Sequence, residues 1–92
     1  MIRNFEIIKT IIHHNRGLII FAKHLGLKHD FVVAEGSLFG EMPIYEYRDM
    51  QTILDNNENP KQEIFVFRPC NMDQLFDKRF VQGQKVTLQT LD

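Results

Sequence analysis

The sequence has a single cysteine, no long apolar run and no excess of charge of either sign. Cys70 cannot form an intramolecular disulfide, and alone it cannot supply a thiolate zinc site, so a reducing compartment is the simplest inference. No segment approaches the roughly 20 apolar residues of a membrane span. Arg3, Glu6 and Lys9 interrupt the apolar start of the chain, which is unlike a signal peptide. We therefore expect a soluble cytoplasmic protein without membrane contacts.

The formal net charge is only −1, with 11 Lys and Arg residues against 12 Asp and Glu residues. A protein that binds nucleic acid through phosphates usually carries a clear positive excess, because each neutralised phosphate needs a Lys or Arg. The charge balance therefore disfavours a nucleic-acid partner, although a local basic patch stays possible. The sequence also lacks the Gly-x-x-x-x-Gly-Lys-[Ser/Thr] loop of nucleotide-binding switches.

The 92 residues suffice for one domain with a small core, and 43% of them are hydrophobic, as in ordinary globular chains. We expect a single β-barrel domain over residues 1–92. Short apolar segments recur along the chain with glycine at the turns between them. This pattern predicts an all-β fold, namely a small closed or partly open β-barrel of five to seven strands with one short helix near residues 71–80.

The segment Met1–His14 allows two interpretations. Its apolar residues occupy odd and even positions alike, and Ile2, Phe5, Ile8 and Ile12 also fit a helical spacing. The abundance of isoleucine and the absence of alanine favour a strand. Such a strand would have apolar side chains on both faces, one for the barrel interior and one for another element or chain. The alternative fold is an α+β domain in which this segment is a helix.

The other predicted strands follow the remaining apolar segments. They are Leu18–Leu25, Phe31–Ala34, Leu38–Tyr47 with a possible continuation at Arg48–Leu54, Glu63–Arg68 and Gln84–Leu91. Pro43 lacks the amide donor of a sheet ladder, so we expect its strand to lie at an edge or to bulge there. Polar and glycine-containing segments predict turns at 13–16, 26–30, 35–37 and 82–83, and a solvent-exposed loop at Asp55–Gln62.

Asn71–Phe80 has the pattern of a short helix. Asn71 can cap it, and Gln74 completes a pair that resembles a capping box. Apolar residues then recur at helical spacing, namely Met72, Leu75, Phe76 and Phe80. We expect this helix to plug one open end of the barrel.

Gly17 follows the polar residues Asn15 and Arg16 and opens an apolar strand. A glycine at such a turn is expected where a side chain would clash or where φ is positive. We therefore predict that Gly17→Ala lowers the free energy of unfolding by about 1 kcal/mol or more if φ is positive there.

These residues carry a resemblance to a known family. An apolar strand leads into Asn15-Arg16-Gly17 and the apolar run Leu18–Ile20, a bend follows at Gly36-Ser37, and Gly83–Leu88 ends the pattern. The arrangement resembles the β-barrel second domain of translational GTPases such as elongation factor Tu, which has a Gly-Arg-Gly step at this place. The resemblance implies a stand-alone barrel without the GTPase, and it suggests a module that contacts RNA or the translation apparatus.

The chain departs from that family at three positions. Asn15 replaces the first glycine of the step, Ala22 stands where a mid-strand glycine is expected, and His24 replaces an apolar residue. The resemblance spans nearly the whole chain, but its motifs are short. It therefore bears on the fold more than on the function.

Four histidines, His13, His14, His24 and His29, form the only cluster that suggests a metal site. Adjacent residues of a strand point to opposite faces, so only one of His13 and His14 can share a face with a partner such as His24. The sequence shows no recognised ligand spacing. We interpret the four as surface histidines near turns and expect no metal site.

Candidates for catalysis are equally sparse. Cys70 precedes a possible helix start, where a thiol pKa can fall, but every histidine that could act as its base lies before residue 30. Four carboxylates could pair for acid–base work, yet they lie in polar segments where charges are usually solvated: Glu41, Glu46, Asp49 and Asp55. We expect no enzyme activity and no cofactor.

Basic and aromatic side chains could form a surface on which single-stranded nucleic acid stacks. The candidates are Arg16, Lys23, Lys28, Arg48, Arg68, Lys78 and Arg79, with Tyr45 and Tyr47. Small barrels often bind nucleic acid in this way. The near-neutral charge weighs against it, and most phenylalanines are expected in the core.

The apolar segment Phe65-Val66-Phe67 and the two-sided first strand suggest an exposed apolar face that pairs with a partner protein or a second copy, unless the 71–80 helix covers it. We therefore expect a non-enzymatic binding or assembly module. Contact with RNA or the translation apparatus is the alternative. The sequence does not identify a small-molecule ligand.

Overall fold

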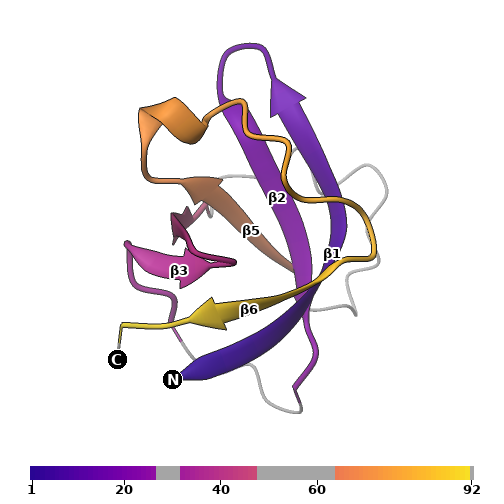
Figure 1. Ribbon diagram of the computed structural model, residues 1–92, viewed down its shortest axis with the longest axis vertical. Coiled ribbons are helices and arrows are strands. Elements are labelled where there is room, and N and C mark those ends of the chain that lie inside the picture. Colours follow the sequence, from indigo (N-terminus) through magenta and orange to yellow (C-terminus); the bar gives the residue numbers. More distant parts are fainter. Residues whose placement is uncertain (27–31, 48–63, 92) are drawn as a thin grey trace.

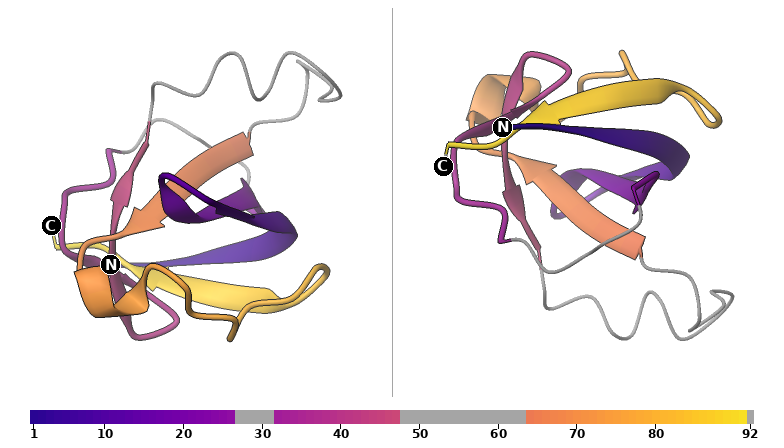
Figure 2. Two further views of the ribbon diagram at one scale, coloured as in Figure 1. Left: turned by 90° about the horizontal axis from the view of Figure 1, so that it is seen from above. Right: turned by 90° about the horizontal axis from the view of Figure 1, so that it is seen from below.

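The computed structural model describes residues 1–26, 32–47 and 64–91, which form a closed antiparallel β-barrel (Figures 1 and 2). Its strands are β1 (Ile2–His13), β2 (Gly17–His24), β3 (Ser37–Phe39), β4 (Met42–Glu46), β5 (Ile64–Pro69) and β6 (Lys85–Gln89), and a 3₁₀ turn, η1 (Met72–Gln74), precedes β6. The structure confirms the predicted all-β barrel. The first segment is a strand, so the α+β alternative is wrong.

The strands follow the order β1-β2-β5-β4-β3-β6 around the barrel, and β6 pairs with β1 to close the ring. The neighbours β3, β4 and β5 lie in chain order, and β6 returns to lie beside β3, which is a Greek-key arrangement. Because the ring is closed, none of the six described strands has a free edge. A partner therefore cannot bind these strands by extending the sheet.

A β-bulge at Ile8 explains the mixed pattern of β1, because the pairing with β2 shifts there by one residue. Before the bulge, Phe5 and Ile7 belong to the core. After it, Thr10 pairs with Ile20, a core residue of β2. The extra residue reverses the alternation, so odd positions face inward before the bulge and even positions face inward after it. Because of this reversal, the apolar residues of β1 follow no two-residue period, and some of them fall at the spacing of a helix.

Leu38–Tyr47 is a hairpin rather than the predicted single strand. Gly40 and Glu41 form a two-residue turn between β3 and β4, with φ of 55° and 71°. Positive φ at both positions is typical of a type I′ turn, whose twist matches that of the flanking strands. The prediction failed because a non-glycine residue such as Glu41 rarely adopts positive φ, so the sequence lacks the usual Asn-Gly signal.

Pro43 lies in β4 between β3 and β5, so the predicted edge position is wrong, and its pairing opposite Leu38 shows no bulge. The ladder between β4 and β5 begins one residue later, at Ile44 opposite Pro69. The Pro43 carbonyl accepts the Cys70 N–H at 2.9 Å. The missing amide of Pro43 thus falls at the end of a ladder, where its absence costs little.

The predicted strand Phe31–Ala34 does not form, since residues 32–34 belong to no strand. Ser37 donates its backbone N–H and its Oγ–H to the Ala34 carbonyl, at 3.1 and 2.7 Å. These bonds bend the chain into β3 instead of extending it. Other predictions lie outside the described residues: most of the 26–30 turn, Arg48–Leu54, the Asp55–Gln62 loop and the first residue of Glu63–Arg68.

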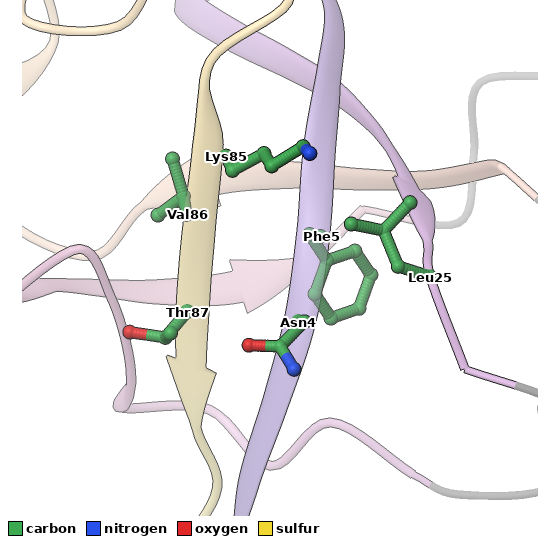
Figure 3. A pocket seen from close by; sticks show the side chains of 6 residues that line it. All are labelled: Asn4, Phe5, Leu25, Lys85, Val86 and Thr87. Atoms are coloured by element: carbon green, nitrogen blue, oxygen red, sulfur yellow. The ribbon is translucent and has the colours of Figure 1, made fainter.

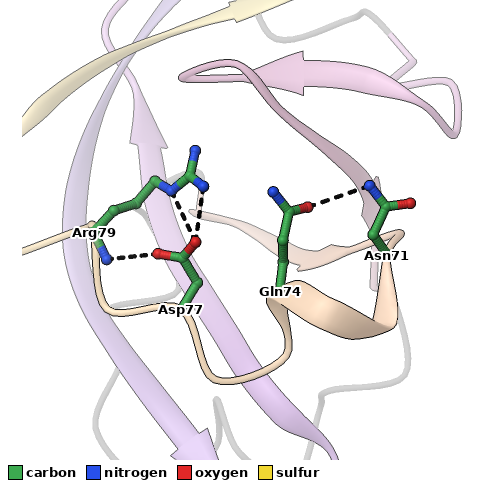
Figure 4. Close-up of polar contacts among 4 residues, drawn as sticks. All are labelled: Asn71, Gln74, Asp77 and Arg79. Atoms are coloured by element: carbon green, nitrogen blue, oxygen red, sulfur yellow. Dashed lines mark hydrogen bonds and ion pairs between the residues drawn. The ribbon is translucent and has the colours of Figure 1, made fainter.

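The helical segment predicted near residues 71–80 is shorter than Asn71–Phe80, because only Met72–Gln74 forms a helical turn, of the 3₁₀ type. The supposed apolar face is largely exposed, with 83% of Met72 and 62% of Phe76 accessible, while Phe80 is buried. Asn71 caps no backbone amide. Its Nδ2 instead donates to Gln74 Oε1 at 3.4 Å (Figure 4).

Two hydrogen bonds explain why the helix stops. A helix would join the Arg79 N–H to the Leu75 carbonyl, four residues earlier. The Leu75 carbonyl instead accepts the Leu18 N–H of β2 at 2.6 Å, and the Arg79 N–H donates to Asp77 Oδ1 at 2.8 Å (Figure 4). The segment thus bonds to the barrel wall and to its own side chain in place of a helical ladder.

Gly17 has the positive φ that the sequence suggested, +76°. A Cβ atom placed there would lie 2.8 Å from the Leu75 carbonyl oxygen and 2.9 Å from the Leu75 Cβ. Glycine therefore permits both the turn into β2 and the close approach of the segment after η1.

Aromatic rings fill the barrel interior. Phe5 is fully buried and meets Phe39, Phe65 and Phe67 edge-on, with ring centroids 5.9, 5.3 and 5.5 Å apart. Phe80 joins this core through Phe39 at 5.4 Å. Edge-to-face aromatic packing of this kind stabilises a core beyond the area that it buries.

A second buried cluster lies on the outer face of β2 and β5. Ile19, Phe21 and Val66 form it, and partly buried Ile8, Ile11, Tyr47 and Ile64 pack against it. Ile8 and Ile11 on the outer face of β1 thus pack beside apolar side chains of the neighbouring strands of the same sheet. Phe65-Val66-Phe67 is buried on both faces, so the exposed apolar face expected there is wrong, and no 71–80 helix exists to cover it.

Candidate binding surfaces

Four predicted side chains meet on the outside of β4 and β5, and we call them the arginine–tyrosine cluster: Arg16, Tyr45, Tyr47 and Arg68. Arg68 lies on β5 opposite Tyr45 of β4. Its Cζ atom lies 6.0 Å from the ring centre of Tyr45 and 5.3 Å from that of Tyr47. Arg16, in the turn between β1 and β2, places its Cζ 5.8 Å from the Tyr47 ring. These distances are typical of cation–π contacts.

Two hydrogen bonds to backbone carbonyls hold the arginine–tyrosine cluster in place. The Tyr47 N–H donates to the Val66 carbonyl at 2.8 Å, which holds the residue after β4 against β5. Arg68 Nη2 donates to the carbonyl of Arg16, 52 residues earlier in the chain. Two guanidinium groups therefore share one tyrosine ring.

A hollow of about 300 Å³ opens between β1, β6 and the end of β2 (Figure 3). Its walls come from paired residues of β1 and β6 and from the residue after β2: Asn4, Phe5, Leu25, Lys85, Val86 and Thr87. Figure 3 shows the Phe5 ring between β1 and Leu25, with Lys85 reaching across β1. The Leu25 N–H donates to the Asn4 carbonyl at 2.9 Å, and 42% of Leu25 stays exposed.

The hollow and the arginine–tyrosine cluster lie on opposite sides of the barrel. The hollow is at the seam of β1 and β6, and the cluster is at the seam of β4 and β5. In the ring order, these two seams are the same number of strands apart in either direction. A molecule bound at one surface therefore leaves the other accessible.

The histidines do not converge on one site. His13 and His14 stack with ring centroids 4.8 Å apart, because His14 lies beyond the end of β1, so the prediction that they face opposite ways is wrong. The Asn15 N–H donates to His13 Nδ1 at 3.1 Å. His24 lies at the far end of β2, 5.2 Å from the Phe5 ring, and His29 is outside the described residues. Within the described ranges, no three His, Cys, Asp or Glu side chains are placed to hold a metal ion.

The sequence candidates for catalysis are scattered. Cys70 follows β5 and is partly buried. Glu41 occupies the β3–β4 turn and Glu46 ends β4. Asp49 and Asp55 lie outside the described residues.

The remaining basic candidates lie away from the arginine–tyrosine cluster or outside the described residues. Arg79 Nε and Nη2 donate to Asp77 Oδ2 at 3.0 and 2.8 Å (Figure 4). The side-chain and backbone hydrogen bonds from Arg79 lower the pKa of Asp77, and the Asp77 carboxylate raises the pKa of Arg79. Lys23 pairs across strands with Glu6. Lys78 is exposed after η1, and Lys28 and Arg48 are not described.

Sequence reasoning missed the hollow entirely. Asn4, Lys85 and Thr87 alternate with core residues, as polar residues do in any strand with one solvated face. Leu25 is one exposed leucine among many apolar residues, which is ordinary in sequence terms. Only the pairing of the first strand with the last brings these residues together.

Comparisons of the chain with protein-family profiles, with curated proteins and with solved structures found no match. The resemblance to the second domain of translational GTPases therefore stays a prediction. Among the described residues, no helix is long and apolar enough to cross a membrane.

Proposed function

We propose that the protein is a non-enzymatic binding module of the cytoplasm that holds a partner protein at the hollow. The observation that supports this proposal is an apolar depression whose rim carries a small number of polar groups. Exposed Leu25 supplies the accessible apolar wall above the buried side chains of Phe5 and Val86, and Asn4, Thr87 and Lys85 supply an amide, a hydroxyl and an ammonium group. Binding sites combine apolar walls with a few oriented polar groups in this way.

The surroundings of the hollow extend the apolar surface. Leu25 lines it and is 42% exposed, and Ile2, two residues before Asn4 on the same face of β1, is 66% exposed. An apolar side chain of a partner can enter the hollow and cover both residues, leaving Lys85 at the rim. Such a contact has the apolar core and polar rim of protein–protein interfaces. Because the described strands form a closed ring, the partner docks through side chains and not by strand addition.

In the experiment, the tagged protein is purified from the cells that naturally produce it. The molar mass of the complex is then measured by light scattering after size-exclusion chromatography. We expect a protein complex of defined mass, which Leu25→Asp abolishes. Val81→Asp is the matched control, because Val81 is also exposed and apolar but does not line the hollow. A wild-type chain that elutes as a bare monomer, or a complex that both variants weaken equally, would contradict the proposal.

Contact with RNA or the translation apparatus is the alternative function. The specific observation in its favour is that Arg16, Arg68, Tyr45 and Tyr47, all predicted for a stacking surface, gather in one place. The alternative predicts that the chain co-purifies with material absorbing at 260 nm and that binding weakens steeply as salt is raised. A preparation free of nucleic acid that binds no RNA at low salt would exclude it.

A further inference from the structure

Arg68 is held in place before any ligand arrives. Its guanidinium lies over the rings of Tyr45 and Tyr47, and Nη2 donates to the Arg16 carbonyl. A long side chain normally loses conformational entropy when it binds a ligand. The contacts to two rings and one carbonyl have already restricted this side chain, so binding through Arg68 costs less.

The guanidinium of Arg68 has N–H donors that are not used in hydrogen bonds. A guanidinium offers five N–H groups in a planar fork. Arg68 Nη2 bonds to Arg16, whereas its Nε is buried and makes no hydrogen bond. Within the described ranges, no ion pair joins Arg68 to a carboxylate. A buried donor without an acceptor is costly, and an anion that reaches it removes that cost.

The chemistry of the arginine–tyrosine cluster fits a carboxylate better than a nucleic acid. A carboxylate accepts two parallel N–H bonds from one guanidinium fork. A nucleic acid needs a track of cations and open ring faces, but the cluster has two arginines, and their guanidinium groups already lie over the tyrosine rings. Tyrosine and arginine are also, with tryptophan, enriched among the residues that dominate binding at the centres of protein interfaces.

We propose that the arginine–tyrosine cluster binds a glutamate or aspartate carboxylate in an acidic segment of a protein. This inference rests on the proposed function only in that the ligand belongs to a protein. The site is separate, because the hollow lies on the opposite side of the barrel. An acidic segment bound here leaves the hollow accessible to a second contact from the same partner or from another.

The test titrates a blocked peptide of alternating glutamate and glycine into the ¹⁵N-labelled chain. The Arg68 Nε–H signal, assigned by its disappearance in Arg68→Lys, is expected to move as the carboxylate binds. A peptide in which glutamine replaces glutamate should bind at least about tenfold more weakly, since a charge-assisted bond is roughly twice as strong as a neutral one. Oligouridylate is titrated in parallel.

Two variants define the role of the fork. Arg68→Gln should weaken the glutamate peptide about tenfold, and Arg68→Lys should do nearly the same, because lysine keeps the charge but loses the planar fork. Arg79→Gln is the matched control, since that arginine is bound to Asp77 and lies outside the cluster. Thermal unfolding of each variant confirms that it is folded.

Equal binding of the two peptides, tighter binding of oligouridylate, or an unmoved Arg68 Nε–H signal at saturation would overturn the inference. The outcome is independent of the hollow. If Leu25→Asp abolishes a natural complex while the glutamate peptide fails to bind, this inference alone is wrong. If the glutamate peptide binds and no complex exists at the hollow, the proposed function alone is wrong.

Discussion

Replacing Gly17 by alanine probes the contact between β2 and the segment after η1. The backbone there has φ +76°, and a left-handed conformation costs a residue with a Cβ about 1–2 kcal/mol. The new Cβ would also lie 2.8 Å from the Leu75 carbonyl oxygen. That oxygen accepts the Leu18 N–H at 2.6 Å, so moving it away endangers a hydrogen bond with a net value of about 1 kcal/mol.

We therefore expect Gly17→Ala to lower the free energy of unfolding by about 2–3 kcal/mol, which narrows the range predicted from the sequence. Gly83→Ala is a control matched in backbone conformation, because Gly83 has φ +84° and no atom within 4 Å of its added Cβ. It should pay only the conformational cost of about 1–2 kcal/mol. Urea unfolding followed by circular dichroism measures both values.

The comparison separates the two contributions. If both variants lose the same free energy to within about 0.5 kcal/mol, the Leu75 carbonyl yields without cost and the reasoning from the close contact is refuted. If Gly17→Ala loses at least about 1 kcal/mol more free energy of unfolding than Gly83→Ala, the difference is the free-energy cost of displacing Leu75. Each kcal/mol corresponds to about 4–8 °C in Tm for a domain of this size.

Two further predictions concern the β3–β4 turn and the Asp77–Arg79 pair. Glu41→Gly relieves a non-glycine residue at φ 71° and should raise the free energy of unfolding by about 0.5–1 kcal/mol in urea melts, and a decrease would show that the Glu41 side chain is needed. Hydrogen bonds from Arg79 hold the folded pKa of Asp77 below its ordinary 3.8, so their contribution to stability is present above that pH and is lost as pH falls through the folded pKa. Carboxyl NMR titration should show a return toward 3.8 in Arg79→Gln, and an unchanged pKa would contradict this assignment.

Local chemistry was enough to predict the barrel but not its irregular places. β5 and β6 were predicted because a short apolar segment and a segment that alternates apolar and polar residues are both typical of strands. The bulge at Ile8 obscured β1, since one inserted residue destroys the two-residue period. The hairpin was not predicted because glutamate rarely adopts a positive φ, and Glu41 gives no sign in the sequence that it does so here. The 71–80 pattern predicted a helix because the Leu18 N–H, which donates to the Leu75 carbonyl in place of a helical N–H, is far away in sequence.

The candidate surfaces depend on the strand order, which the sequence does not display. Arg16, Arg68 and the two tyrosines were predicted only as members of a larger basic and aromatic set. Their convergence requires β5 to lie between β2 and β4. Arg79 belonged to the same set but is bound to Asp77, two residues away. The hollow requires Lys85 and Thr87 of the last strand to pair with the first strand, a contact between distant parts of the chain.

The closing pair of β6 with β1 also constrains how the protein is made. Ile2 pairs with Gln89, and the Thr90 N–H and Oγ–H both donate to the Met1 carbonyl, 89 positions earlier. Such distant pairings make folding slow, on the scale of milliseconds to seconds for small β proteins. During synthesis on the ribosome, β1 and β3 each lack their β6 neighbour. Their unpaired edges can aggregate until β6 emerges. Chaperone demand should therefore peak just before residues 85–89 leave the ribosome.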